Sequence, residues 1–406
     1  MISEAATSDG VLETVNQWVA AQADVIPVVP GWNVLIKHPN DIRSVLTSRN
    51  YTKETGPNRY FRANVADGVL TAPPERHRGE RLVLNRATQD HELLDRVAVD
   101  KTDALAARLR RRAASGERVD LTAEVTRLTL AIVAEATLGW TDIDELEDAL
   151  AAGTAVLQSR GLMLPPESAM APIRKRCLQV INDMIEGCPD TRRRPVYIAM
   201  VDAGYDRETI ADQILTLLLA GHETTANTLA WTWISLIRNP AVYIRWRRQL
   251  HTHPESASVV TRNIAREGLR LYPSSWIIGR VAIIDGGFDG VPVPAGCTVS
   301  ISPFVTHRHP QFWGPDPEAF DPDRHNRPPD HRYAWLPFGA GARMCLGSTY
   351  AMREMEICLS ILGKQFRFHS EDANSATPRF RFTLGTPPIR VDIEAIGGNV
   401  RKFEHR

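Results

Sequence analysis

The chain has 406 residues, of which 43% are hydrophobic and 24% are charged, the balance of an ordinary globular protein. Basic and acidic side chains both number 48, so the bulk charge favours neither nucleic acid nor an acidic membrane surface as a partner. No basic stretch followed by an apolar one opens the chain, and no segment supplies about 18 uninterrupted apolar residues. We therefore expect a monomeric cytoplasmic protein that binds neither nucleic acid nor membrane.

The first half of the chain changes from strand-like to helical patterning. Short apolar runs cut by proline and glycine predict strands near residues 20–50. Apolar residues at helical spacing then predict a helix that starts at Val119 and stops at Gly139. The stretch RGLMLPPESAMAP, residues 160–172, contains three prolines and is typical of a loop between helices.

The longest predicted helix spans Arg207 to Arg238, with Asp206 as its N-cap. At 1.5 Å per residue it would be about 48 Å long, enough to cross a whole domain. A second strand-rich portion is expected near residues 281–302. Residues 1–406 are therefore predicted to form a single domain, mainly α with small β-sheets (α+β).

The five cysteines, at positions 177, 188, 297, 345 and 358, have no regular spacing and do not indicate a disulfide framework. Cys345 alone has an unusual setting, the glycine-rich segment FGAGARMCLG at residues 338–347. A helix predicted over residues 347–362 would place its positive N-terminus beside Cys345 and lower the pKa of the thiol. A thiolate near Arg343 suits haem iron and one propionate. The alternative is a buried cysteine in a helix-capping turn.

FGAGARMCLG resembles the haem-binding loop of the cytochrome P450 family at Phe338, Gly341, Arg343, Cys345 and Gly347. The resemblance implies the cytochrome P450 fold, with a long central helix over a haem b (iron protoporphyrin IX) held by this loop. It implies that Cys345 is the axial metal ligand and that Arg343 binds a propionate. Phe338 would pack beneath the haem near the sulfur, and Gly347 would complete the cofactor-binding loop.

The segment AGHETT, residues 220–225, lies in the middle of the longest predicted helix. Glycine and two threonines are poor mid-helix residues, and threonine hydroxyls can bond to the preceding turn and open the helix. The segment is similar to the oxygen-binding groove of the family, which implies that Glu223 and Thr224 are the catalytic acid–alcohol pair that delivers protons. Gly221 would leave room beside the iron, and His222 would point away. A polar surface stripe is the alternative.

Two further sets of charged residues match family motifs. Glu267 and Arg270 share a helix face, and the resemblance implies a structural pair that Arg324, from FDPDR, would lock. The resemblance also implies three propionate-binding residues. These are His77 and Arg81, which match an H-x-x-x-R pair, and Arg280. A solvated helix face is the alternative for His77 and Arg81.

The resemblance implies a monooxygenase that inserts one oxygen atom from O2 into a hydrophobic small molecule, for example by hydroxylation. The substrate is expected to be a secondary-metabolite skeleton (terpenoid, polyketide or fatty acid). The expected lining of its pocket, for which an ordinary core is the alternative, is Leu217, Leu218, Trp276, Ile277, Ile278 and Leu384. Oxidative coupling, desaturation, peroxide-driven oxidation and a non-catalytic haem-binding sensor stay open.

The 406 residues are accounted for by the haem domain, so electrons are expected from an external ferredoxin and ferredoxin reductase. Six arginines are candidates for a basic docking face around the cysteine side. They are Arg76, Arg78, Arg110, Arg111, Arg112 and Arg353. Solvated helix charges are the alternative.

Overall fold

The computed structural model describes residues 8–88, 90–159, 162–187, 195–327 and 329–396. It is mainly helical with small sheets, which confirms the predicted class. The first helices are α1 (Ser8–Ala20), α2 (Pro39–Thr47), α3 (Gly56–Asn64), α4 (Pro74–Ala87), α5 (His91–Ser115), α6 (Leu121–Leu138), α7 (Asp144–Gln158) and α8 (Glu167–Gly187). The later helices are α9 (Pro195–Asp202), α10 (Arg207–Arg238), α11 (Pro240–Thr252), α12 (Pro254–Leu271), α13 (Pro303–Thr306), α14 (Pro310–Trp313), α15 (Ser348–Gln365) and α16 (Asp372–Ser375).

Three short 3-10 helices lie between α14 and α15: η2 (Pro322–Asn326), η3 (Arg332–Ala334) and η4 (Gly341–Arg343). The first strands are β1 (Val25–Val29), β2 (Asn33–Ile36), β3 (Tyr51–Thr52), β4 (Val119–Asp120), β5 (Ile278–Ala282) and β6 (Gly286–Phe288). The later strands are β7 (Val291–Val293), β8 (Thr298–Ile301), β9 (Phe366–His369), β10 (Arg379–Phe380), β11 (Leu384–Gly385) and β12 (Arg390–Ala395). None of the helices within the described ranges has the length and apolarity that a bilayer span requires.

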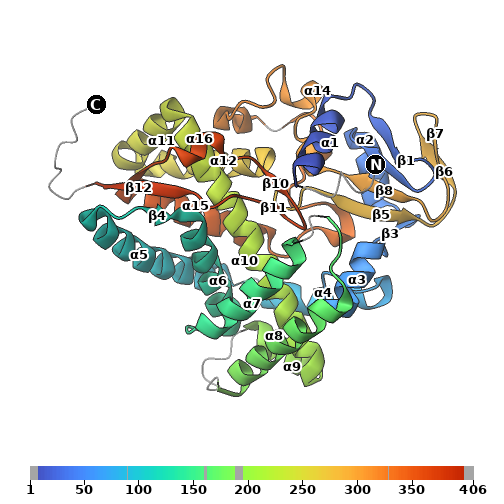
Figure 1. The fold of residues 1–406 in the computed structure, drawn as a ribbon, viewed down its shortest axis with the longest axis horizontal. Coiled ribbons are helices and arrows are strands. Elements are labelled where there is room, and N and C mark those ends of the chain that lie inside the picture. Colours follow the sequence, from blue (N-terminus) through green and yellow to red (C-terminus); the bar gives the residue numbers. More distant parts are fainter. Residues whose placement is uncertain (1–7, 89, 160–161, 188–194, 328, 397–406) are drawn as a thin grey trace.

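Helix α10 begins and ends where the sequence predicts, and it runs through the middle of the molecule (Figure 1). The Asp206 side chain caps it by accepting a hydrogen bond from the Thr209 N–H at 2.8 Å. The five-stranded sheet lies on the opposite side of α10 from α5 (Figure 1). The expected opening of the helix at AGHETT is wrong, because α10 is continuous there, although the Thr224 hydroxyl does donate to the Ala220 carbonyl at 2.6 Å.

Three local predictions need correction. Residues 39–47, expected to be strand-like, form α2, which a proline at its first position starts. The helix predicted from Val119 begins two residues later, because β4 pairs with β12, and it stops at Gly139 in the left-handed conformation as expected. The proline-rich loop is shorter than expected, since α8 begins at Glu167 and contains Pro172.

The largest sheet has the strand order β1-β2-β8-β5-β3, in which β2 and β8 are parallel. In its register, Thr52 of β3 lies opposite Val281 of β5. Because these strands are antiparallel, residue 53 leaves β3 beside residue 280. A three-stranded sheet, β4-β12-β9, and the hairpins β6–β7 and β10–β11 complete the strands of the described chain.

A buried carboxylate joins α12 to the irregular segment that precedes Cys345. Both oxygens of Glu267 accept hydrogen bonds from Arg270, at 2.7 and 2.8 Å, and both side chains are 0% exposed. Arg324 donates to the same carboxylate at 3.1 Å, which confirms the predicted triad. His325 adds a contact at 2.9 Å that the sequence did not reveal. Burial alone would raise the pKa of Glu267, but the hydrogen bonds from Arg270 and His325 outweigh it and lower the pKa to about 2.

His307 extends this network to the cysteine loop. Its Nδ1 donates to the Arg270 carbonyl at 3.0 Å, so in the neutral ring Nε2 accepts the Leu336 N–H at 2.8 Å. Burial lowers the pKa of His307 to about 3, which keeps the ring neutral and preserves this tautomer. Leu336 lies two residues before Phe338, so the ion network and the cysteine loop are mechanically connected.

The first prediction concerns the buried carboxylate. Glu267→Gln should reduce the free energy of unfolding by about 3–5 kcal/mol, because it leaves the fully buried Arg270 guanidinium without a counter-charge. Glu356→Gln is the matched control, since its partner Arg262 is 54% exposed, and it should cost less than about 1 kcal/mol. Urea unfolding followed by circular dichroism measures both, and equal losses would contradict the prediction.

Candidate active site

The cysteine loop is folded by its glycines and by one backbone hydrogen bond. The Cys345 N–H donates to the Phe338 carbonyl at 2.8 Å and closes the loop ahead of α15. Gly341 has φ +71°, and a Cβ there would lie 2.2 Å from the Leu46 carbonyl oxygen. This position therefore admits only glycine, for reasons of both conformation and space. The Phe338 ring packs edge-on against Trp335, with centroids 6.3 Å apart.

The expected lowering of the Cys345 pKa is wrong for the protein alone. Burial raises the pKa of this thiol, although a hydrogen bond from the Gly347 N–H and the charge of Arg81 oppose the rise. The Cys345 side chain nevertheless keeps an exposed surface, so its sulfur is accessible to a ligand. A metal ion at the sulfur would reverse this balance, because a coordinated thiol is held as the thiolate.

Cations gather beside the loop. Arg343 donates through Nη2 to the Ala72 carbonyl at 2.8 Å, and Arg81 of α4 donates to the Met344 carbonyl. Burial and the charge of Arg343 lower the pKa of Arg280 to about 10. Burial and the charges of Arg343 and Arg81 lower the pKa of His77 to about 4. These four residues are the ones predicted to bind propionates, and the structure brings them together.

The two carboxylates whose charges act most strongly on Arg343 are already paired with other arginines. Glu54 makes a two-pronged ion pair with Arg62, and Glu80 pairs with Arg76. The buried Nη1 of Arg343 has no hydrogen-bond partner. A buried donor without a partner, on a half-buried arginine that neighbours other cations, is stabilised by an anion. The two propionates of a haem fit this demand, so these residues suit the cofactor that the resemblance implies.

Lys53 belongs to the same cluster, and the sequence did not reveal it. Its Nζ donates to the Leu70 carbonyl at 2.6 Å. Burial and the charges of Arg280 and Arg343 lower its pKa to about 7. The pairing of β3 with β5 carries Lys53 to Arg280, and a lone lysine in YTKETGP gives no local signal of that pairing. Only the sheet register could have identified it.

Glu223 lies in a hydrogen-bond network that spans three segments. Its Oε1 accepts from Gln158 Nε2 at the end of α7, at 2.5 Å, and from the Thr383 hydroxyl of the β10–β11 turn, at 2.7 Å. Arg381 donates to the Gln158 Oε1 at 3.3 Å. Glu223 is therefore an engaged carboxylate rather than part of a solvated surface stripe. Thr224 is held from outside α10, since Ser274 donates to its carbonyl at 2.7 Å.

Gly221 and His222 are both packed within the core beside α6 and α10. A Cβ at Gly221 would lie 2.9 Å from Val133 Cγ2. The missing side chain therefore serves the close packing of α10 on α6. His222 is buried, and its ring bonds to the Leu218 carbonyl of its own helix at 2.7 Å.

The six residues expected to line a substrate pocket divide into two groups. Leu218, Trp276 and Leu384 are at most 1% exposed and belong to hydrophobic clusters, which fits the ordinary-core alternative. Leu217, Ile277 and Ile278 are only partly buried and so keep surface that a ligand can contact. Leu217, Ile277 and Ile278 therefore remain the candidates for contact with a substrate.

The arginines expected to form one basic face do not do so. Arg76 pairs with Asp67 and Glu80, Arg353 pairs with Asp95, and Arg112 lies 3.5 Å from Glu124. Arg110 donates to Gln365, the last residue of α15, about 26 Å along that helix from its cysteine end at 1.5 Å per residue. Arg78 of α4 stays exposed, and α4 does contact the cysteine loop through Arg81.

Comparison with known proteins places this geometry in a class and then in a family. A six-coordinated cytochrome P450 from Thermus thermophilus superposes with a TM-score of 0.75 at 24% identity, covering 95% of this chain and 98% of the other. The fold is therefore the cytochrome P450 fold. A model of the cytochrome P450 family matches residues 29–394. The chain belongs to this family, and it is a monooxygenase enzyme with a haem-iron cofactor.

Two relatives match over nearly the whole chain. Cyclooctatin synthase from Streptomyces melanosporofaciens is 28% identical over 389 residues, which cover 87% of this chain and 84% of the relative. Pentalenene oxygenase from Streptomyces avermitilis is 29% identical over 401 residues, which cover 86% of this chain and 87% of the relative.

The second prediction concerns Lys53. Because its pKa is lower folded than unfolded, the unfolded chain holds more protons between about pH 7 and about pH 10, so the apoprotein gains stability as the pH rises through that window. Lys53→Gln should reduce the rise in stability with pH, because it removes the lysine charge that Arg280 and Arg343 repel. It should also speed haem loss from the holoprotein. Urea unfolding of the apoprotein against pH and haem transfer to a scavenger protein measure the two effects. Lys175→Gln, on the exposed face of α8, is the control, and identical pH slopes in both variants would refute the prediction.

Proposed function

We propose that this chain binds haem b through Cys345 and oxidises a hydrophobic small molecule. The observation that carries the proposal is the unpartnered, buried Nη1 of Arg343, two residues from Cys345 and next to the cations Arg81 and Arg280. His77, Arg81 and Arg280, together with Arg343, would hold the propionates. A bound haem iron supplies the activation of dioxygen.

The protein residues would supply ligation and protons. Cys345 would donate electron density as a thiolate. Glu223, oriented by Gln158 and Thr383, would help to relay protons, and Thr224, next to it on α10, would pass them toward the cofactor. An acid engaged by two donors is already oriented, which supports a catalytic role over that of a carrier or sensor.

The names of the two Streptomyces relatives support a secondary-metabolite skeleton as substrate. Electrons would come from an external ferredoxin and its reductase. Arg78 stays available for such a partner, whereas most of the other candidate arginines are engaged within the chain.

The third prediction tests the axial ligand. The dithionite-reduced, CO-bound protein should show the strongly red-shifted Soret band of a thiolate-ligated haem, because the sulfur shares electron density with the iron. Cys345→His should replace it with the band of an imidazole-ligated haem. Cys358→Ser is the control, since this cysteine is buried against Thr102 and should leave the band in place. A wild-type band typical of imidazole or free haem in folded protein would overturn the proposal.

The fourth prediction tests proton delivery. Thr224→Ala should reduce product formed per NAD(P)H consumed by about tenfold or more and release hydrogen peroxide instead, because a positioned proton donor contributes about 10²–10⁴-fold. Thr225→Ala is the matched control, because it removes the same type of hydrogen bond, here to the Gly221 carbonyl at 3.1 Å, from a threonine with no proposed role in proton delivery, so it should stay coupled. A reconstituted assay with a ligand found by spin-state shift measures this ratio. Equal coupling in both variants would count against the dioxygen route.

A further inference from the structure

The turn between β10 and β11 contains an arginine that has no carboxylate partner among the residues that the structure describes. Arg381 directly follows β10, and its backbone N–H donates to the Thr383 carbonyl at 3.2 Å, which closes the turn. Its own carbonyl accepts a hydrogen bond at 2.8 Å from the indole of Trp276, which is 1% exposed. The backbone of Arg381 is therefore held from two sides, and so is the point from which its side chain extends.

The side chain of Arg381 is half-buried, and the protein satisfies it poorly. Its Nη1 donates to the Gln158 Oε1 at 3.3 Å, which is longer than the usual N–H···O distance of about 2.7–3.2 Å. Its buried Nε has no hydrogen-bond partner. A guanidinium presents its donors as a planar fork that matches the two oxygens of a carboxylate. Arg381 thus keeps unused donors of the kind that a carboxylate binds.

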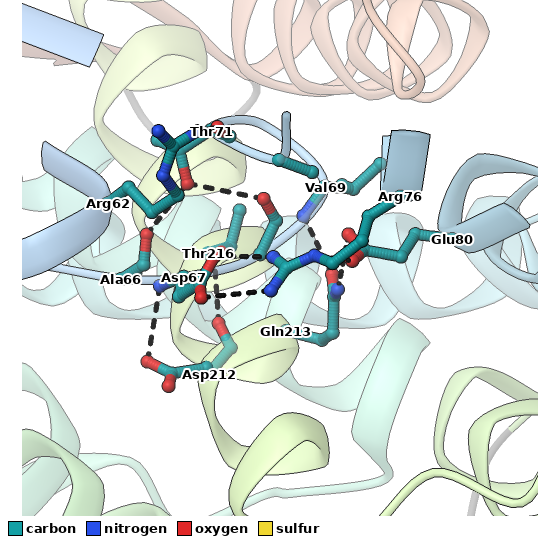
Figure 2. Close-up of polar contacts among 12 residues, drawn as sticks. Arg62, Ala66, Asp67, Val69, Thr71, Arg76, Glu80, Asp212, Gln213 and Thr216 are labelled. Atoms are coloured by element: carbon teal, nitrogen blue, oxygen red, sulfur yellow. Dashed lines mark hydrogen bonds and ion pairs between the residues drawn. The ribbon is translucent and has the colours of Figure 1, made fainter. Parts of the chain in front are cut away.

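Arg76 of α4 shows how another arginine near the site is neutralised. Its guanidinium pairs with Asp67 of the 65–73 loop, between α3 and α4, and with Glu80 of its own helix (Figure 2). Arg76 is exposed and has two carboxylate partners, whereas Arg381 is more deeply buried and has none within the described ranges. Because burial removes a charge from water, the deeper arginine has the greater need of an anion.

Gln158 separates Arg381 from the carboxylate of Glu223. Its Nε2 donates to Glu223 at 2.5 Å while its Oε1 accepts from Arg381, so one neutral amide stands between the two charges. The Thr383 hydroxyl donates to the same Glu223 oxygen at 2.7 Å. That oxygen is already satisfied by two donors, and the positive charge of Arg381 is left for another anion.

Apolar side chains lie beside the arginine. Phe382, the next residue, is 46% exposed, and its ring stacks on Phe61 of α3 with centroids 4.4 Å apart. Phe61 belongs to a hydrophobic cluster that includes Leu157 at the end of α7 and the partly buried Leu219 of α10. A cation next to apolar surface suits a molecule that has an apolar body and one anionic group.

We propose that Arg381 binds a carboxylate of the substrate, so that the substrate class is an apolar skeleton bearing an acid group. This inference rests on the proposed function and adds the polar group by which the substrate is recognised. Nε and one Nη would donate to the two carboxylate oxygens, and Gln158 would give up its long hydrogen bond. An alcohol on the same skeleton cannot form this ion pair, so it binds more weakly.

The test is isothermal titration calorimetry of the ferric holoprotein with a linear and a polycyclic pair of ligands. The linear pair is dodecanoic acid and 1-dodecanol, and the polycyclic pair is abietic acid and abietol. At least one acid should bind about tenfold more tightly than its alcohol, because a hydrogen bond to a charged group is stronger than a neutral one. Calorimetry detects this binding whether or not the spin state of the iron changes.

Arg381→Gln should abolish the preference for the acid, and Arg381→Lys should keep part of it, since lysine retains the charge without the fork. Arg390→Gln, at an exposed arginine of β12, is the matched control and should keep the wild-type preference. An acid preference that survives in Arg381→Gln would rule out the assignment. So would wild-type protein that binds neither acid more tightly than its alcohol, a comparison that needs no variant to fold.

The CO spectrum separates this inference from the proposed function on which it rests. Wild-type protein and each variant are first tested for the thiolate-type band. If the wild-type protein lacks that band, it is the proposed function that fails. If the band is present and neither acid is preferred, only the carboxylate assignment fails.

Discussion

The position of the candidate metal ligand depends on the buried Glu267 carboxylate. The segment from Pro303 to Cys345 consists of short helical turns, so its own backbone cannot fix its course. Glu267 accepts hydrogen bonds from Arg270, Arg324, His325 and the Asp321 N–H, and it thereby ties this segment to α12. A charge this deeply buried is tolerated only when its partners are in place, so the carboxylate favours one arrangement of the segment over all others.

His307 connects the ion network around Glu267 to the cysteine loop through its two ring nitrogens. Because one nitrogen bonds the Arg270 carbonyl and the other accepts the Leu336 N–H, a protonated His307 would lose the second bond. Burial keeps the ring neutral by lowering its pKa. The tautomer of one histidine thus couples a structural ion network to the backbone that presents Cys345.

Local sequence signals were sufficient for some features and not for others. A few adjacent residues were enough to predict the N-cap Asp206, the helix end at Gly139 and the cysteine loop. The structure has all three at the expected positions. Lys53 and Gln158 were missed because sheet register and helix packing bring them to the site, and neither is visible in one local pattern. The same limit applies to Gly221, whose neighbour Val133 lies on another helix.

The polar side chains of α10 show why the alternative of a surface stripe was reasonable and yet incomplete. Gln213, Glu223, Asn227 and Thr228 recur at helical spacing, as on a solvated face. Their partners, however, lie on the 65–73 loop, the end of α7, the β10–β11 turn and the start of the segment after α12. Apart from the end of α7, these segments have little regular structure of their own, and their polar groups need external partners. The polar side chains of α10 thus hold the irregular segments around the site in position. Glu223 and Thr224, the proposed proton relay, lie on the same helix as the side chains that make these contacts.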